Sequence, residues 1–192
     1  MTREKNMLIL ASASPRRQEL LRQIGCEFRV FVSRAEELSA SGVPPEKLAT
    51  ENARRKAEEA ASRDTTGLPV LGADTVVAVD AAILGKPKDE EDAAKMLRLL
   101  SGRKHFVYTG VAILDSEEKI IFAEKSEVTF FDITDEKIQQ YIETGEPMDK
   151  AGAYGIQDNA NFPIVKSYIG SYSNIVGFPL EKIKKELENI KK

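Results

Sequence analysis

Hydrophobic and polar positions change their spacing repeatedly along the 192-residue chain, a pattern typical of strands alternating with helices. Short apolar or alternating runs predict strands at residues 7–11, 28–32, 70–79, 83–84, 105–114 and 120–131. Helical stripes predict helices at residues 15–24, 45–61, 90–100, 135–144 and from 180 onward. A polar turn at 115–119 predicts an antiparallel hairpin, and the stretch 152–177 is rich in glycine. The pattern predicts a mixed α/β sheet.

Asp74 is a charged residue in a run, residues 70–79, that is otherwise almost entirely apolar. Such a run is typical of a strand covered on both faces. An unpaired carboxylate buried there costs several kcal/mol or becomes neutral, so Asp74 requires a partner. A metal ion, a basic side chain or a set of backbone N–H groups meets this requirement. The alternative is an aspartate that only ties down a neighbouring loop.

Lys56 lies within a helical stripe of small residues. Drawn at about 100° per residue, the helix at 45–61 places four alanines in one stripe with Lys56 among them: Ala49, Ala53, Ala57 and Ala60. The charged residues on either side of Lys56 point to the solvated face. An inward lysine indicates a nearby anion, and the alternative is a lysine that extends past the alanines to water.

The first predicted helix begins with Ser14 as N-cap and Pro15 at its first position, and Gly25 ends it. Arg17 lies on the apolar side of its first turn. Free N–H groups and the helix dipole favour an anion at this end, whereas a basic side chain opposes the dipole unless a negative ligand lies between them. Ser14 and Arg17 therefore predict a phosphate site, although Ser-Pro helix starts are common.

Composition limits the classes of partner. Lys and Arg number 28 against 31 Asp and Glu, so the chain lacks the basic excess of a nucleic-acid binder. Hydrophobic residues make up 42 %, which supports one packed domain over residues 1–192. Cys26 is the single cysteine, which excludes an intrachain disulfide. Residues 1–6 are charged, and no apolar run reaches the roughly 18 residues of a membrane helix. We expect a cytoplasmic protein with a small phosphorylated ligand and no membrane or nucleic-acid partner.

Five ordered segments between residues 8 and 179 resemble motifs of the Maf family of nucleoside triphosphate pyrophosphatases. They are residues 11–17 (ASASPRR), 72–75 (GADT), 85–87 (GKP), 101–103 (SGR) and 149–157 (DKAGAYGIQ). The resemblance implies a cytoplasmic enzyme that cleaves a nucleoside triphosphate to the monophosphate and pyrophosphate with a divalent cation, Mg²⁺ or Mn²⁺. It also implies a mixed, twisted β-sheet flanked by helices, with two lobes around a deep cleft as in enzymes that hydrolyse inosine triphosphate, and a homodimer.

The same resemblance implies roles for individual residues. Asp74 corresponds to the catalytic aspartate, and Glu37 with Asp74 corresponds to the metal-binding pair. The phosphate-binding positions are Ser14, Arg17, Lys56 and Lys86. Glu36 adjoins Glu37, and a paired acidic loop is often only surface charge. Several cations suit a triphosphate of about four negative charges, and carboxylates suit a metal ion whose bound water attacks the α-phosphorus. Asp74 could act as metal ligand, as general base or as both.

Arg16, Thr75 and Gln157 resemble a trio of residues found in family members that prefer thymidine and uridine triphosphates. Gln157 offers donors and an acceptor to a pyrimidine edge. The alternatives are an exposed helix residue for Arg16, a strand filler for Thr75 and a loop anchor for Gln157. His105, the single histidine, begins a strand, and we expect it to pack in the core without a catalytic role.

Three hypotheses on function remain at this point. The first is the nucleoside triphosphate pyrophosphatase. The second is a nucleotide-binding regulator of septum formation and cell division without turnover, against which Asp74, Lys56 and Lys86 argue. The third is a phosphatase that removes only the terminal phosphate. Identification of the released product as pyrophosphate, orthophosphate or neither separates the three.

Overall fold

The computed structural model describes residues 7–38 and 42–190. The charged segment 1–6 lies outside the described residues. The helices are α1 (Pro15–Gln23), α2 (Pro45–Arg63), α3 (Glu90–Leu100), α4 (Asp135–Glu143), α5 (Tyr172–Val176) and α6 (Leu180–Ile190), with short 3₁₀ helices η2 (Glu146–Asp149), η3 (Ala151–Ala153) and η4 (Ile156–Ala160). The strands are β1 (Met7–Leu10), β2 (Glu27–Val30), β3 (Val70–Val79), β4 (Ala82–Leu84), β5 (Lys104–Leu114), β6 (Lys119–Phe130) and β7 (Val165–Ile169).

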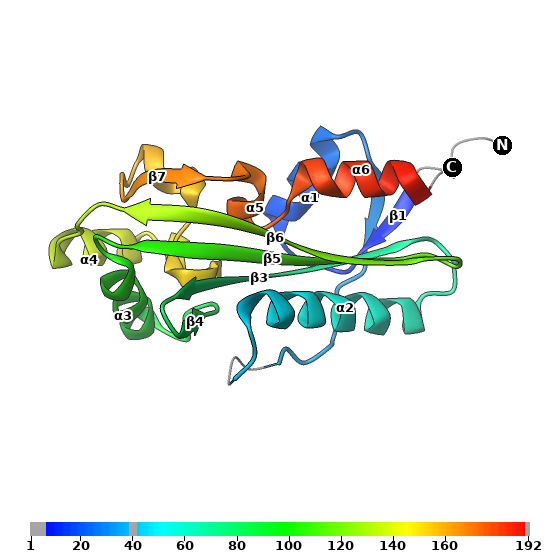
Figure 1. The fold of residues 1–192 in the computed structure, drawn as a ribbon, viewed down its shortest axis with the longest axis horizontal. Coiled ribbons are helices and arrows are strands. Elements are labelled where there is room, and N and C mark those ends of the chain that lie inside the picture. Colours follow the sequence, from blue (N-terminus) through cyan, green and yellow to red (C-terminus); the bar gives the residue numbers. More distant parts are fainter. Residues whose placement is uncertain (1–6, 39–41, 191–192) are drawn as a thin grey trace. The chain divides into compact units, whose positions relative to one another are not determined.

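The strands form one mixed sheet of order β2-β1-β3-β5-β6-β7, with β4 paired to β3 (Figure 1). β1 runs parallel to both β2 and β3, whereas β4 is antiparallel to β3 and β7 is antiparallel to β6. β5 and β6 are neighbours, and a hydrogen bond from Asp115 N to Glu118 O (2.9 Å) closes the turn between them. The predicted mixed α/β sheet with flanking helices is therefore confirmed.

The chain divides into two compact units. The first unit comprises Met1–Asp74, Thr109–Glu124 and Gly177–Lys192, and the second comprises Thr75–Tyr108 and Lys125–Val176. Strands β3, β5 and β6 contribute residues to both units, because each crosses a boundary between them. The expectation of a single domain over residues 1–192 stays a prediction.

Side chains of the first unit's strands alternate between two packed layers, because successive residues of a strand point to opposite faces. On one face Leu8, Leu10, Leu71, Ala73, Val111 and Ile113 pack with apolar residues of α1 and α6. On the other face Ile9, Ala11, Val70, Ala112 and Leu114 pack against the alanines of α2. Figure 1 shows α2 on one side of these strands and α1 and α6 on the other.

The layer between α2 and the sheet is thin because small residues meet there. An added Cβ at Gly72 would overlap the carbonyl oxygen of Ala53 and lie 2.8 Å from the backbone nitrogen of Ala57. An added Cβ at Gly110 would overlap the backbone of Ala49. The predicted alanine stripe is thus confirmed, and its cause is the close approach of the α2 backbone to β3 and β5.

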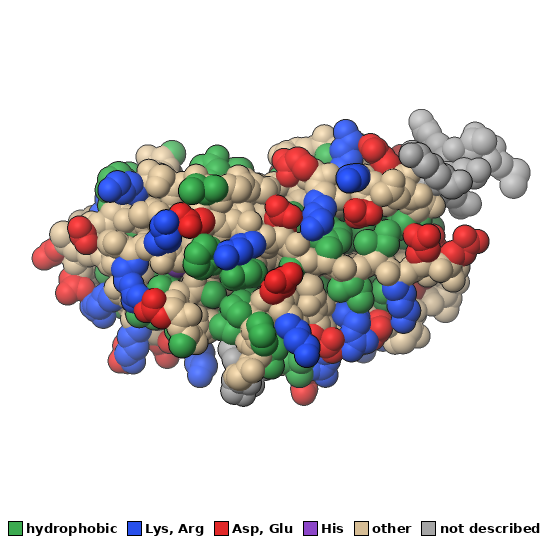
Figure 2. Space-filling view, viewed as in Figure 1, with side chains coloured by type: hydrophobic (Ala, Val, Ile, Leu, Met, Phe, Trp, Pro, Cys, Tyr) green, Lys and Arg blue, Asp and Glu red, His purple; other side chains and the backbone are tan. Residues whose placement is uncertain are grey.

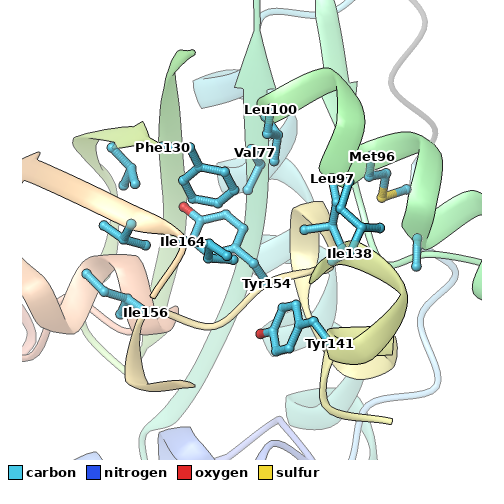
Figure 3. Close-up of a cluster of buried hydrophobic side chains, with 14 of the residues drawn as sticks. Val77, Met96, Leu97, Leu100, Phe130, Ile138, Tyr141, Tyr154, Ile156 and Ile164 are labelled. Carbon is cyan, nitrogen blue, oxygen red and sulfur yellow. The ribbon is translucent and has the colours of Figure 1, made fainter. Parts of the chain in front are cut away.

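The second unit has its own apolar core (Figure 3). Strand residues such as Val77 and Phe130 pack there with Leu97 and Leu100 of α3 and with Ile138 of α4. The apolar stripe predicted for α3 is buried, which confirms the helical spacing read from residues 90–100.

His105 lies fully buried in this core. Its Nε2 is 2.9 Å from the hydroxyl oxygen of Tyr154, and its ring packs edge-on against Phe130. Burial lowers the pKa of His105 to about 4, because the charged imidazolium would lose its hydration. His105 is a core residue, as the sequence indicated.

The surface carries charges of both signs. On the face shown in Figure 2, Lys and Arg side chains alternate with Asp and Glu side chains rather than forming one basic patch. Among residues 7–38 and 42–190, no helix combines the length and apolar character required to cross a membrane.

Candidate active site

Asp74 lies near the middle of β3, on the sheet face that α2 covers, and is 7 % exposed. Residues 70, 72 and 74 share this face, because side chains alternate along the strand. Lys56 Nζ donates to Asp74 Oδ1 at 2.6 Å, and Asn52 Nδ2 donates to Oδ2 at 3.1 Å. Of the three kinds of partner considered for Asp74, the structure therefore shows a basic side chain, that of Lys56. The side-chain amide of Asn52 is a second partner.

Lys56 links Asp74 to a second carboxylate. Its Nζ also lies 2.6 Å from Glu37 Oε1, and the Lys56 side chain is 15 % exposed. The anion expected beside this inward lysine is thus supplied by the protein itself. Asp74, Lys56, Glu37 and Asn52 together form what we call the carboxylate–lysine cluster. The structure brings three of the predicted site residues together in it.

Asn52 belongs to the cluster but was not predicted from the sequence. Its side chain is buried, and its Oδ1 accepts a hydrogen bond from Leu38 N at 2.8 Å. A signal for it exists in the sequence, because Asn52 precedes Lys56 by one helical turn and so projects from the same side of α2.

Arg17 is half-buried, and its guanidinium donates hydrogen bonds to three oxygen atoms of the first unit. Nε donates to Gly177 O at 3.0 Å, and Nη1 donates to Ala73 O at 2.8 Å and to Ser12 Oγ at 3.2 Å. Burial lowers the pKa of Arg17, and the nearby carboxylate of Asp74 opposes that change. Arg17 therefore ties the backbone next to Asp74 to α1, and its predicted contact with phosphate stays a prediction.

Ser14 is the N-cap residue of α1 and Pro15 follows at the first helical position, as predicted. The Ser14 side chain makes no capping hydrogen bond, and its backbone N–H donates to Ser12 Oγ at 3.3 Å. Gly25 ends the helix with a φ of +68°, a left-handed conformation that favours glycine. Arg16 is half-buried. The helix start is confirmed, whereas its phosphate-binding role stays a prediction.

The other predicted site residues belong to the second unit. Lys86 is exposed just after β4, and Gln157 is exposed in the first turn of η4. Gly152 N donates to Gly85 O at 3.0 Å, so the segment before Lys86 is joined to the segment that leads to Gln157. Thr75 follows Asp74 in β3, and successive side chains of a strand point to opposite faces. The predicted roles of these three residues stay predictions.

A network of ion pairs around a buried lysine fixes the segment that carries Gln157. Lys150 is 5 % exposed. Its Nζ lies 2.8 Å, 3.2 Å and 3.6 Å from carboxylate oxygens of Glu146, Asp149 and Asp158, respectively. Tyr141 donates its hydroxyl proton to Asp158 Oδ2 at 2.6 Å, and burial raises the pKa of this tyrosine. The sequence did not single out this network.

The cluster offers oxygen ligands for a divalent cation, but few of them. Among the described residues, no group of three or more His, Cys, Asp or Glu side chains is placed to hold a metal ion. Asp74 and Glu37 supply two carboxylates, and Lys56 Nζ lies within hydrogen-bond distance of both. Mg²⁺ is commonly bound by one or two carboxylates together with substrate phosphates. The donor set fits such an ion when a phosphorylated substrate completes its coordination.

Comparison with known proteins identifies the family of this chain. A curated protein of Thermococcus gammatolerans named dTTP/UTP pyrophosphatase is 52 % identical over 177 residues, which cover 92 % of this chain and 93 % of the relative. A protein of Agathobacter rectalis with the same name is 45 % identical, covering 96 % of this chain and 98 % of the relative. The solved structure of the Staphylococcus aureus Ham1 protein has a TM-score of 0.54 at 15 % identity, covers 96 % of this chain and 99 % of that chain, and supports the fold alone. The family model for Maf-like proteins matches residues 7–190, so the chain belongs to the Maf-like protein family.

Proposed function

We propose that this chain hydrolyses nucleoside triphosphates to the nucleoside monophosphate and pyrophosphate, with dTTP and UTP as preferred substrates. Water attacks the α-phosphorus, the bond from that phosphorus to the bridging oxygen breaks, and pyrophosphate leaves. The names of relatives that are 45 % to 52 % identical over nearly the whole chain support this reaction. They do not favour a regulator of septum formation without turnover.

The observation that carries the proposal is the carboxylate–lysine cluster around the buried Asp74. Asp74 is held by donors on both oxygens in a layer of small residues, and Lys56 lies between Asp74 and Glu37. Charged groups concentrated in this way are common at catalytic sites. The second carboxylate beside Lys56, that of Glu37, is 58 % exposed, so a ligand can reach it from solvent.

The residues of the cluster have distinct tasks in the proposed reaction. Lys56 neutralises charge on the triphosphate, as do Arg17 in α1 and Lys86 after β4, and Ser14 donates a hydrogen bond to a phosphate oxygen from its hydroxyl. Asp74 accepts a proton of the attacking water at a carboxylate oxygen, since each of its oxygens has more than one lone pair. Asp74 and Glu37, together with the substrate phosphates, would hold a divalent ion, which would supply charge neutralisation and water activation.

Base preference is assigned to Arg16, Thr75 and Gln157. Gln157 presents an amide that pairs with a pyrimidine edge, and the Lys150 network holds the segment from which it projects. Mg²⁺ or Mn²⁺ as the cofactor, a homodimeric assembly and a cytoplasmic location complete the proposal, and these rest on the family resemblance.

The proposal is tested by product analysis. The purified protein is incubated with Mg²⁺ and a panel of nucleoside triphosphates, and pyrophosphate and orthophosphate are quantified separately. We expect pyrophosphate with every substrate that turns over, with the highest kcat/KM for dTTP and UTP. Release of orthophosphate alone would identify a terminal phosphatase, and the absence of either product would support binding without turnover.

A further inference from the structure

Asn52 contacts both segments that carry the acidic residues of the cluster. It lies on α2, and the residue is 3 % exposed. Its Nδ2 donates to Asp74 Oδ2 at 3.1 Å, and its Oδ1 accepts from Leu38 N, the residue after Glu37, at 2.8 Å. One amide therefore bridges the catalytic strand and the acidic loop.

The two ends of this amide are not interchangeable. Leu38 N is a donor and requires the oxygen end of Asn52, so the nitrogen end must face Asp74. The Nδ2 group of Asn52 is a donor and requires an acceptor, which is Oδ2 of Asp74. The contact with Leu38 thus sets the direction of the contact with Asp74.

Asp74 is consequently held at both carboxylate oxygens by residues from one face of α2. Lys56 binds Oδ1, and Asn52 binds Oδ2 one helical turn earlier. Rotation of the carboxylate plane would break one or both contacts. Small displacements of a reacting group can cost about 100-fold in rate.

We propose that Asn52 is a positioning residue that sets the plane of the Asp74 carboxylate for the reaction by donating from Nδ2. This inference rests on the proposed pyrophosphatase function, in which Asp74 is catalytic. Asn52 itself touches neither the water nor the triphosphate in this assignment. Its effect is on kcat, because the phosphate-binding residues remain in place.

Two variants of Asn52 test the proposal. Asn52→Leu removes both amide contacts while keeping a similar volume, and Asn52→Asp keeps the acceptor for Leu38 N but removes the donor to Asp74. At about pH 8.5, above the ordinary range of carboxyl pKa values, we expect kcat for dTTP to fall tenfold or more in both. KM should change less than threefold.

A matched control is Arg54→Gln on the same helix. Arg54 pairs with Glu51 and Glu58 and makes no contact with Asp74, so this variant loses ion pairs but should keep the wild-type kcat. Thermal denaturation of each variant sets an assay temperature at which all of them are folded.

The outcomes distinguish a failure of the positioning role of Asn52 from a failure of the proposed pyrophosphatase function. Wild-type kcat in Asn52→Leu or in Asn52→Asp, or a rise in KM with kcat unchanged, overturns the positioning role while the proposed function stands. Wild-type protein that releases no pyrophosphate overturns the proposed function itself. A selective loss of kcat in both variants with Arg54→Gln unaffected supports the positioning role.

Discussion

Replacement of Lys56 by methionine removes the charge that balances Asp74. The two side chains are 15 % and 9 % exposed, and Nζ lies 2.6 Å from Oδ1. Loss of one partner from such a buried pair costs about 3 to 5 kcal/mol, because the other charge is left without compensation. Methionine keeps the length and apolar stem of lysine, so packing against the alanines of α2 should change little.

Asp74→Asn should destabilise the protein less than Lys56→Met does, because Lys56 keeps its contact with the exposed Glu37. In the double variant Lys56→Met/Asp74→Asn neither buried charge remains, so stability should return to within about 1 to 2 kcal/mol of the wild type. Activity should not return. Each single variant and the double variant should lose at least tenfold in kcat/KM, which corresponds to about 1.4 kcal/mol.

Urea unfolding near neutral pH measures the three free-energy changes, and pyrophosphate release measures activity in the same preparations. Wild-type stability of Lys56→Met, or simple addition of the two single losses in the double variant, would show that the two buried charges do not stabilise each other. Recovery of activity together with stability would show that the ion pair has only a structural function.

Three further predictions concern other parts of the chain. His105 has a folded-state pKa of about 4 against 6.5 unfolded, so the unfolded chain binds the extra proton first and stability should fall by about 3 kcal/mol as pH drops from 6.5 to 4. Urea unfolding at several pH values should show this loss, and His105→Phe should lack it. Gln157→Glu should lower the dTTP to GTP ratio of kcat/KM roughly tenfold, since amide donors are replaced by an acceptor-only carboxylate. Gly110→Ala should destabilise the protein by about 1 to 3 kcal/mol in urea unfolding, because the added methyl group overlaps the backbone of Ala49.

Each of these predictions has a clear contrary result. Equal acid sensitivity in the wild type and His105→Phe would assign that sensitivity to carboxylates instead. An unchanged nucleotide ratio in Gln157→Glu would remove its role in base choice without affecting the pyrophosphatase assignment. Wild-type stability in Gly110→Ala would mean that α2 can move away from β5 at little cost.

Elements with strong periodicity could be predicted from the sequence. The apolar run of β3 and the stripes of α2 and α3 are buried as their spacing indicated, because burial of one face is what selects those residue types. β7 was not predicted. Its last four residues are exposed, so it has no alternation to detect, and it lies in a stretch rich in glycine.

The candidate site could be predicted from the sequence only in part. Sequence alone indicated that buried Asp74 required a partner and that an anion could lie near Lys56, but it could not show that these two side chains pair with each other across 18 positions. That pairing depends on α2 covering the face of β3 on which Asp74 lies, and on Gly72 allowing the close approach. Asn52 was not predicted as a site residue, because asparagine side chains are mostly exposed. Its burial results from the same close approach of α2 to β3.

The most direct test of the central claim is the position of water attack. Hydrolysis of dTTP in water enriched in heavy oxygen, followed by mass spectrometry of the products, locates the new oxygen atom. Attack at the α-phosphorus predicts the label in thymidine monophosphate and none in pyrophosphate, and Asp74→Asn should form neither product at a measurable rate. Label in pyrophosphate or orthophosphate, or full turnover by Asp74→Asn, would contradict the account.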